Sequence, residues 1–384
     1  MSFFMTSLEA KKYWIALRMV PGVGTMTYRK LLNTFVTPEQ VFSASRHLLR
    51  SVPGIAEKTV ANILNFEWSD RIKRELEAIE KARVQVVTWQ DSQYPERLKR
   101  IFDPPPILYV KGNDLEAHEL MLAVVGSRKA STYGRTVAEN LCREFAVKGL
   151  SVVSGMARGI DSAVHRGTLK AGGRTVAVLG CGIDVIYPPE NTRLYHEIAE
   201  KGSLVSELPM AAKPDRGNFP ARNRIISGMS LGTVVVEAGA RSGALITADM
   251  ALEQGRDVFA VPGNITSASS RGTNRLIKQG AALVEHADDV LNAIPLELSR
   301  DLQHHLQEEF SFHHSSSPEQ PDSSPSDLSE HEQCVFELIE QQPIHIDEIT
   351  VRSKLPSGTV SAILMMLEMK SLIRQLAGKM FLRV

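Results

Sequence analysis

The residues best suited to chemistry are arginines, glycines and hydroxyl side chains that follow short apolar runs. Gly126-Ser127-Arg128 comes directly after the run MLAVV and precedes a helical stretch around 133–147. Such a turn directs backbone N–H groups and the positive end of a helix at an anion. Ser127 would add a hydroxyl donor, and Arg128 could grip a phosphate through two parallel hydrogen bonds. The alternative is a tight turn with an exposed arginine, and the triplet alone favours neither.

A second turn of the same kind, SGMARGID, follows the next apolar run and supplies Gly155, Arg158 and Gly159. Asp161 and His165 stand four residues apart, hence on one helix face, and could form an acid–base couple. No nucleophile or metal set accompanies them. We therefore favour the interpretation that Asp161 faces the helix dipole while His165, as its partner, holds the loop.

The densest cationic segment, RGNFPARNR, has three arginines in nine residues and no acid. Its candidate binding residues are Arg216, Phe219, Arg222, Asn223 and Arg224. Arginines with one interleaved aromatic suit single-stranded nucleic acid, in which cations follow phosphates and a ring stacks on an unpaired base. The alternative has the ring in the core and the arginines solvated or paired with Glu207 and Glu237. We favour binding, because the segment leads into a helix.

Two later turns add polar groups to the same predicted edge. Ser242 and Gly243 can present N–H groups to a phosphate, and we expect Glu237 to orient an arginine rather than to abstract a proton. The turn Pro262-Gly263-Asn264 is followed by an open polar stretch that contains Asn274. Several phosphate-type turns on one edge predict a groove rather than a pocket for one nucleotide.

Other chemistries are poorly supported. The turn GSRKAS lacks the G-x-G-x-x-G pattern of dinucleotide binding, and no G-x-x-x-x-G-K-[ST] segment occurs. Cys142, Cys181 and Cys334 lie far apart, which predicts reduced thiols rather than disulfides or a zinc site. We expect no cofactor, no bound metal and no catalytic residue.

The elements that position these turns repeat one rhythm through residues 113–295. Six apolar runs, each ended by a turn and most of them followed by a helical stretch, are MLAVVG, LSVVSG, TVAVLG, LVSEL, GTVVVEAG and DVFAVPG. Near-continuous apolar runs alternating with helices indicate a parallel sheet covered on both faces. We predict an α/β, doubly wound, Rossmann-like fold with its ligand site beyond the carboxyl ends of the strands.

The segment 1–80 is predicted to be helical, with a weak internal repeat. Residues 16–32 and 48–64 each contain a helix, a Val-Pro-Gly turn and a second helix, as in helix-hairpin-helix motifs. Gly22 and Gly24 keep the G-x-G form that could contact a nucleic-acid backbone, whereas Ala56 replaces the second glycine in the other copy. A packing module is an equally plausible reading.

The C-terminal region divides into a linker and a small domain. Residues 299–329 are rich in Ser, Pro and acids, which predicts a flexible acidic linker. Residues 330–384 show helix, helix, helix and a short basic hairpin, the order of a winged helix-turn-helix. Its candidate recognition helix, 357–370, offers few donors for base edges, so sequence-specific reading of DNA is doubtful.

The predicted domains and the charge fit together. The domains are a helical domain at 1–80, a bridging segment at 81–112, the Rossmann-like domain at 113–298, the linker at 299–329 and the winged helix at 330–384. The chain has 44 basic and 44 acidic residues, which excludes a uniformly basic binder. Residues 296–330 alone carry one arginine and eight acids. Neither a signal peptide nor an apolar membrane span is evident, so we expect a cytoplasmic protein.

Taken in order, GSR (126–128), SGMARGID (154–161), FPARNRIISG (219–228), VVVEAGARSGALITA (234–248) and PGN (262–264) resemble the DNA processing protein A family, DprA, also called Smf. The resemblance covers nearly the whole chain. It implies a cytosolic homodimer that binds and protects incoming single-stranded DNA during natural transformation and helps to load the recombinase RecA. It also implies DNA contacts at Gly126, Ser127, Arg128 and the segment from Phe219 to Arg224, with Arg216 preceding that segment, and no established catalytic residues.

Two other functions compete with this one. A nucleotide-phosphate hydrolase of the lysine-decarboxylase-like, or LOG, type uses P-G-G-x-G-T-x-x-E, which Gly232-Thr233 and Glu237 echo weakly. Residues 227–230, SGMS, stand where the Pro-Gly-Gly should be, which removes most of that phosphate cradle. A winged-helix transcription factor would instead show a strong preference for one duplex sequence.

Overall fold

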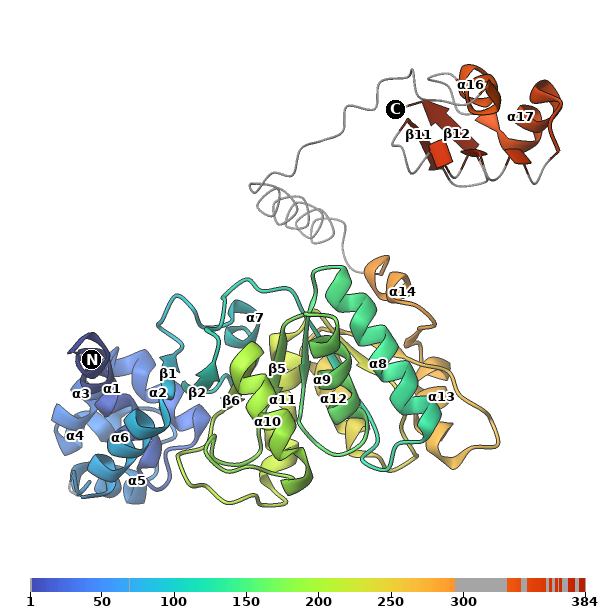
Figure 1. The fold of residues 1–384 in the computed structure, drawn as a ribbon. Helices are drawn as coiled ribbons and strands as arrows, with labels where there is room; N and C mark the ends of the chain where they lie inside the picture. Colours follow the sequence, from blue (N-terminus) through green and yellow to red (C-terminus); the bar gives the residue numbers. More distant parts are fainter. Residues whose placement is uncertain are drawn as a thin grey trace. The chain divides into compact units, whose positions relative to one another are not determined.

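The chain falls into two compact units, residues 1–311 and 312–384, which we describe separately (Figure 1). The computed structural model describes residues 2–68, 70–293, 330–339, 344–356, 359–360, 363–364, 366–367, 372–376 and 380–383. The predicted linker, 299–329, lies outside these residues.

A nine-stranded sheet organises the first unit. Its strands are β1 Gln85–Thr88, β2 Ile107–Gly112, β3 Met121–Val125, β4 Ser151–Ser154, β5 Thr175–Val178, β6 Ser203–Ser206, β7 Gly232–Val235, β8 Asp257–Ala260 and β9 Ala282–Leu283. They lie in the order β1-β2-β6-β5-β4-β3-β7-β8-β9. The strands from β6 to β9 are parallel, while β2 pairs antiparallel with both β6 and β1. The predicted doubly wound parallel sheet is therefore confirmed.

Each of the six predicted apolar runs forms a strand, because a strand covered on both faces needs apolar side chains at every position. All five residues of β3 are buried. The sequence rhythm did not reveal β9, which has only two residues, both exposed. The segment between 83 and 112 supplies two antiparallel strands, the edge strand β1 and its neighbour β2.

Helices cover both faces of the sheet. The crossover helices are α8 Thr132–Val147, α9 Ile160–Lys170 and α10 Thr192–Lys201 on one face, and α11 Asn218–Met229 and α12 Gly243–Glu253 on the other. The unit also contains three short helices, α7 Glu96–Lys99, α13 Arg271–Lys278 and α14 Ala287–Leu291, and two 3-10 turns, Pro189–Asn191 and Ala268–Ser270. α8 packs along α9, and α11 packs against α12 and α7. Separate apolar clusters fill the two faces.

The N-terminal helices form two hairpins, as the internal repeat predicted. Their bounds are α1 Ser2–Met19, α2 Thr25–Phe35, α3 Pro38–Ser43, α4 Arg46–Ser51, α5 Glu57–Leu64 and α6 Asp70–Ala82. Trp14 stacks on Tyr28, with ring centroids 5.9 Å apart, and both rings meet Trp89 just after β1. One apolar cluster contains residues from these helices and from β2, β5 and β6. The helical region is thus packed onto the antiparallel end of the sheet.

The second unit is a small winged helix, as predicted. It contains α16 Glu330–Glu337, β10 Ile344–His345, α17 Ile346–Ser353, β11 Ile373–Leu376 and β12 Met380–Arg383. The three strands pair in the order β10-β12-β11. The described residues of the predicted third helix, between 359 and 367, are helical, and Val360 and Leu364 are buried with Val335, Ile349 and Phe381. Of the helices described in either unit, none is both long and apolar enough to cross a bilayer.

A glycine on α9 sets how closely α8 and α9 approach. A Cβ atom at Gly167 would lie 2.5 Å from the carbonyl oxygen of Glu139 on α8. Gly167→Ala should therefore force the helices apart and lower the free energy of unfolding by about 1–3 kcal/mol, despite the better helix propensity of alanine. Urea denaturation followed by circular dichroism measures this change.

Gly243→Ala is the matched control, because a Cβ atom at Gly243 meets nothing within 4 Å. That variant should be as stable as the parent or slightly more stable. Equal stability of the Gly167→Ala variant and the parent would show that the two helices can separate at no cost.

Candidate nucleic-acid interface

A large cleft lies where the direction of the sheet winding reverses. β3 has β4 on one side and β7 on the other, so successive crossovers leave it in opposite directions. Beyond the carboxyl ends of β3 and β7 is a cleft of about 760 Å³, bordered by the turn at 126–129, the start of α11 and the start of α12. This is the edge at which open α/β sheets bind ligands, and it is where the sequence placed the site.

The cleft is lined by cations with almost no opposing acid. The exposed basic residues on its wall are Arg128, Lys129, Arg216 and Arg241. Among the lining residues, Asp161 is the one carboxylate, and it is buried. The four exposed cations therefore concentrate positive potential in a concave surface, which attracts a polyanion.

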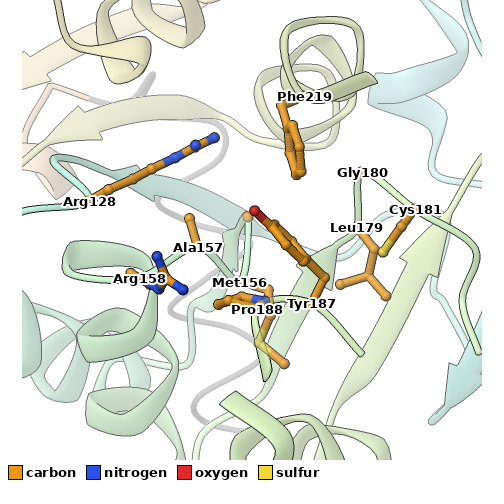
Figure 2. Close-up of a pocket in the computed structure, with 11 residues that line it drawn as sticks. Arg128, Met156, Ala157, Arg158, Leu179, Gly180, Cys181, Tyr187, Pro188 and Phe219 are labelled. Carbon is orange, nitrogen blue, oxygen red and sulfur yellow. The ribbon is translucent and has the colours of Figure 1, made fainter. Parts of the chain in front are cut away.

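Two aromatic rings and one guanidinium converge at the cleft wall. The Arg128 guanidinium carbon lies 5.2 Å from the centroid of the Phe219 ring, a cation–π contact. The Phe219 ring lies 5.6 Å from the Tyr187 ring at an interplanar angle of 37°. The three side chains surround a small cavity of about 40 Å³ (Figure 2). That volume holds a few waters and not a whole base, so the rings offer a surface rather than an enclosed slot.

The turn that carries Arg128 is held by its own backbone. Ser127 donates its N–H to the carbonyl of Glu237 over 2.7 Å and accepts an N–H from Lys129 at its hydroxyl. Gly159, with φ at 78°, lies against the Ser127 carbonyl so closely that a Cβ atom there would collide with it. Of the backbone N–H groups that the sequence predicted to face an anion, that of Ser127 is therefore already used within the protein. The side chain of Arg128 remains exposed.

Glu237 fixes the start of α8 rather than an arginine. Its carboxylate accepts hydrogen bonds from the N–H and the hydroxyl of Ser131, which is the N-cap of α8. Ser131 in turn accepts the N–H of Gly134. This corrects the prediction that Glu237 orients an arginine, because a buried carboxylate at this strand tip is satisfied by the helix N-terminus opposite it.

Arg222 is a buried strut and not a solvent-facing cation. It is 4% exposed and donates hydrogen bonds to the carbonyls of Gly155, over 2.8 Å, and Val178. Burial lowers the pKa of its guanidinium to about 10, and the nearby carboxylate of Asp161 opposes that shift. The prediction that Arg222 contacts a ligand freely is corrected, because the guanidinium is committed to two strand ends. Gly155, also buried, belongs to this same support.

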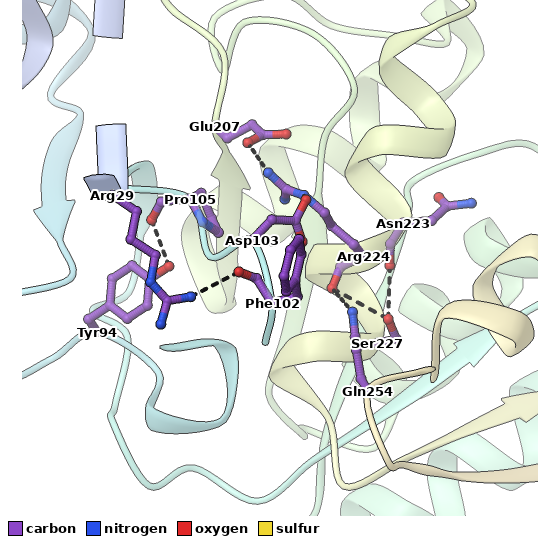
Figure 3. Close-up of polar contacts among 10 residues, drawn as sticks. All are labelled: Arg29, Tyr94, Phe102, Asp103, Pro105, Glu207, Asn223, Arg224, Ser227 and Gln254. Atoms are coloured by element: carbon purple, nitrogen blue, oxygen red, sulfur yellow. Dashed lines mark hydrogen bonds and ion pairs between the residues drawn. The ribbon is translucent and has the colours of Figure 1, made fainter. Parts of the chain in front are cut away.

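Arg224, unlike Arg222, does not line the cleft. Its guanidinium forms ion pairs with Asp103 at 2.8 Å and with Glu207 at 2.6 Å, and it is nearly buried (Figure 3). The alternative reading, in which an arginine of this segment pairs with Glu207, is therefore the correct one at this position. Helical geometry explains the difference, since Arg224 lies two residues from Arg222 and so on another side of α11.

The remaining predicted residues divide between the cleft and other places. Asn223 and Arg216 line the cleft, as do Ser242 and Gly243, where Ser242 caps α12. Arg158 lines the small cavity and forms an exposed ion pair with Glu190 at 2.6 Å.

Asn274 does not reach the cleft. Its amide accepts the N–H of Gly263 and donates to the carbonyl of Gly263, at 3.1 and 2.9 Å. Asn274 thus clamps a loop, which corrects its assignment as a binding residue.

Asp161 and His165 do not form a couple. Asp161 accepts the N–H of Ala157 in the loop before α9, in keeping with the favoured reading. The Nδ1 atom of His165, however, lies 2.7 Å from the Thr175 hydroxyl on β5, so the expected role of His165 as a partner of Asp161 is wrong. Burial raises the pKa of Asp161 and lowers that of His165 to about 3.

The hairpin glycines lie at a separate cleft of about 440 Å³. Gly22 and Gly24 border it together with Arg18 and Arg71 from the same helical region, and Tyr109 lies on its far wall. Both glycines are exposed. Gly24 is the N-cap of α2, and no side chain caps that helix.

Sequence reasoning missed several residues of the main cleft. Tyr187 stands in a loop nine residues after β5, with no periodic pattern or motif around it. Three further lining residues lie inside the predicted turns or the helix that follows, but no motif position marks them: Lys129, Arg241 and Ile246. A broader rule, in which every basic residue in the turn after a strand is a candidate, would have included Lys129. Within the described ranges, no three His, Cys, Asp or Glu side chains gather in a way that would hold a metal ion.

The buried histidine predicts a pH dependence of stability. His165 takes up a proton near pH 6.5 when the chain is unfolded but only near pH 3 in the folded protein, so acid favours unfolding between those values. Its contribution should reduce the free energy of unfolding by about 2 kcal/mol between pH 6.5 and pH 5. Urea midpoints of the parent and of His165→Gln, measured across this range, isolate the share due to His165.

The parent should lose stability more steeply than the variant as the pH falls. Parallel curves would mean that folding does not change the pKa of His165.

Comparisons with known proteins indicate the family of the chain. Residues 85–295 match the family model for DNA recombination-mediator protein A. Residues 319–379 match the DprA winged helix domain, and residues 15–69 match a SAM-like helix-hairpin-helix tandem. Protein Smf of Synechocystis is 34% identical over 391 residues, covering 97% of this chain and 98% of that protein.

Two further relatives agree. DNA processing protein DprA of Bacillus subtilis is 42% identical over 230 residues, covering 60% of this chain and 77% of that protein. The X-ray structure of DprA from Streptococcus pneumoniae superposes with a TM-score of 0.66 at 34% identity and covers 74% of this chain and 98% of that one. Since these matches span the sheet domain and both flanking modules, the chain belongs to the DprA/Smf family of DNA recombination-mediator proteins.

Proposed function

We propose that the protein is a non-enzymatic, cytoplasmic single-stranded DNA binder that protects incoming strands, helps to load RecA and acts as a homodimer. The observation that carries this proposal is the group formed by Arg128, Phe219 and Tyr187 on the wall of a cationic cleft. The family name, recombination mediator, and the name DNA processing protein DprA of the relatives support the same ligand class.

The aromatic rings favour a single strand over a duplex. Phe219 and Tyr187 are both partly exposed, and Tyr187 has 37% of its surface accessible. A base can stack on such a ring only when it is unpaired and splayed from its neighbour. Stacking contributes about 1–3 kcal/mol per base and tolerates any sequence, which suits a protein that must accept any strand.

The cations supply the phosphate contacts. Arg128, Lys129, Arg216 and Arg241 are exposed, and none of them forms an ion pair within the part of the chain that the structure describes. They are therefore available to replace counterions on a strand. The start of α12 at Gly243 faces the same space and adds backbone donors.

The titratable groups near the cleft support a binding role over hydrolysis. Glu237 holds the N-cap of α8, and the Asp161 carboxylate faces a buried guanidinium and a backbone N–H. His165 is fully buried against Thr175. Each of these three groups thus has a structural partner.

The domain boundaries that we propose remain 1–80, 81–112, 113–298, 299–329 and 330–384. The segments matched by the three family models, 15–69, 85–295 and 319–379, are compatible with a division into three modules. Gly22 and Gly24 are proposed as an additional backbone contact because they border a cleft that also holds Arg18 and Arg71.

The cleft can be tested with two single variants. Arg128→Ala should weaken binding of oligothymidylate and reduce the slope of log K against log salt by about 0.7, the value of one phosphate contact on a single strand. Phe219→Ala should cost about 1–3 kcal/mol through lost stacking while leaving the salt slope unchanged. Fluorescence anisotropy titrations at several salt concentrations measure both effects.

Arg166→Ala is the matched control, because Arg166 is an exposed arginine on α9 that does not line the cleft. It should bind like the parent. Arg222→Ala is unsuitable, since it removes a buried support. If Arg128→Ala and Phe219→Ala both bind like the parent at every salt concentration, the cleft is not the binding site.

The loading role predicts an effect on RecA. On single-stranded DNA coated with a single-strand binding protein, addition of this protein should shorten the lag before RecA hydrolyses ATP. A double variant that combines Arg128→Ala with Phe219→Ala should lose the effect, because it binds the strand too weakly. Arg166→Ala should keep the effect. An unchanged lag with the parent protein would exclude mediation while leaving DNA binding intact.

A further inference from the structure

A cluster of three arginines lies at the amino edge of the sheet. Arg256 directly precedes β8, and its guanidinium donates a hydrogen bond of 3.2 Å to the carbonyl of Arg97 on α7. The N–H of Arg100 donates to that same carbonyl over 3.3 Å. The carbonyl oxygen of Arg97 therefore accepts one hydrogen bond from the side chain of Arg256 and one from the backbone of Arg100. Arg97 and Arg256 are partly buried, and Arg100 is exposed.

The cluster lacks acidic partners. Within the described part of the chain, the side chains of Arg97, Arg100 and Arg256 form no ion pair, and the Nε atom of Arg256 is buried without a hydrogen-bond acceptor. Glu96 pairs with Lys99 instead, at 3.6 Å. Glu253 and Asp257, the acids nearest to Arg256 in the chain, are exposed and form no ion pair with it.

The three guanidiniums repel one another, and this repulsion lowers the pKa of both partly buried members. Burial lowers the pKa of Arg97, and the charges of Arg256 and Arg100 lower it further. Burial also lowers the pKa of Arg256, and Arg100 adds to that effect. Three like charges held together without a counter-charge cost stability, and an anion bound between them would recover it.

The turn that carries Arg256 is anchored, so the cluster is a built feature. Gln254, at the end of α12, donates its amide to the carbonyl of Arg224 over 3.1 Å (Figure 3). On the other side, a Cβ atom at Gly228 of α11 would meet Leu98 of α7 at 2.9 Å, so α7 is seated tightly on α11. The two segments that carry the arginines are therefore fixed by packing on α11.

The cluster is distinct from the main cleft. The cleft residues follow the carboxyl ends of β3 and β7, whereas Arg256 precedes the amino end of β8, which is parallel to both. A strand of four or five residues separates the two edges by roughly 15 Å. None of the three arginines lines the cleft.

We infer that the cluster of Arg97, Arg100 and Arg256 is a second phosphate-binding surface, which holds a further stretch of the single-stranded nucleic acid bound in the cleft or a second strand. The inference rests on the proposed function, because it assigns another contact for the same class of ligand. Two exposed apolar side chains flank the cluster in sequence: Leu252, 58% exposed, and Phe102, 75% exposed. An exposed phenylalanine two residues after Arg100 favours a nucleic acid over an acidic peptide, since it can stack on a base.

The test compares a short and a long oligothymidylate. One of roughly 6 nucleotides lies within the size of a single binding site, and one of roughly 40 can reach both edges. Arg100→Gln together with Arg256→Gln should lower affinity for the long strand by roughly tenfold and reduce its salt slope by about 1.4, the value of two phosphate contacts. Affinity for the short strand, which the cleft alone holds, should not change.

The control variants separate local contacts from overall charge. Arg143→Gln with Arg166→Gln removes two exposed arginines from α8 and α9, on the other face of the sheet. That pair should bind both strands like the parent. Arg100→Gln alone perturbs no side-chain hydrogen bond that the structure describes, so it should fold normally and show about half the change in salt slope.

The outcomes distinguish this inference from the proposed function. If Arg128→Ala weakens both strands while the cluster variants weaken neither, the cleft stands and the second surface is wrong. The second surface is equally wrong if the charge-matched pair has the same effect, or if the cluster variants weaken the short strand as much as the long one. Polyglutamate serves as an acidic-peptide probe. If the cluster variants weaken binding of polyglutamate and of neither strand, the surface binds an acidic protein and the inference is wrong. If Arg128→Ala affects neither strand and the cluster variants weaken the long one, the cleft assignment fails and the second surface stands.

Discussion

The arrangement of the cleft depends on one buried guanidinium. Taking Arg222 out of water costs several kcal/mol, and that cost is offset only because its donors meet the carbonyls of Gly155 and Val178 while Asp161 supplies a nearby charge. These bonds tie the ends of β4 and β5 to the first turns of α11. Phe219 lies three residues before Arg222 and therefore on the same side of α11. The bonds of Arg222 thus also hold Phe219 at the cleft wall.

The same support explains why the adjacent loops can present charge without rearranging. Ser127 and Gly159 contact each other through the backbone, and Glu237 fixes the helix start that follows. The turn is therefore rigid, and the Arg128 side chain leaves it from a fixed point. A ligand that binds there need not order the loop first, so less of the binding energy is lost to conformational entropy. Preorganisation of this kind compensates for contacts that are individually weak.

Patterns of apolar residues predicted the fold well, because each parallel strand must be apolar at every buried position. They also located the site, since the turns after such strands meet at one edge. They did not distinguish the arginines of RGNFPARNR, because the position of each arginine on or before α11 decides whether its guanidinium reaches two strand carbonyls, two acids or solvent. Arg222, Arg224 and Arg216 took those three outcomes. Tyr187 was invisible for a related reason, as only the packing of its loop brings it to Phe219.

The neutral charge of the chain is compatible with anion binding because acids and cations are unevenly distributed over the surface. Asp103 and Glu207 neutralise Arg224, and Glu190 pairs with Arg158. The cleft wall differs from the rest of the surface in its lack of exposed acids. Among the described residues, four exposed cations without an ion pair line the carboxyl-edge cleft, and two partly buried arginines without one lie at the amino edge. The local potential, and not the net charge, determines where a polyanion binds, since screening confines each charge to about 10 Å in ordinary salt.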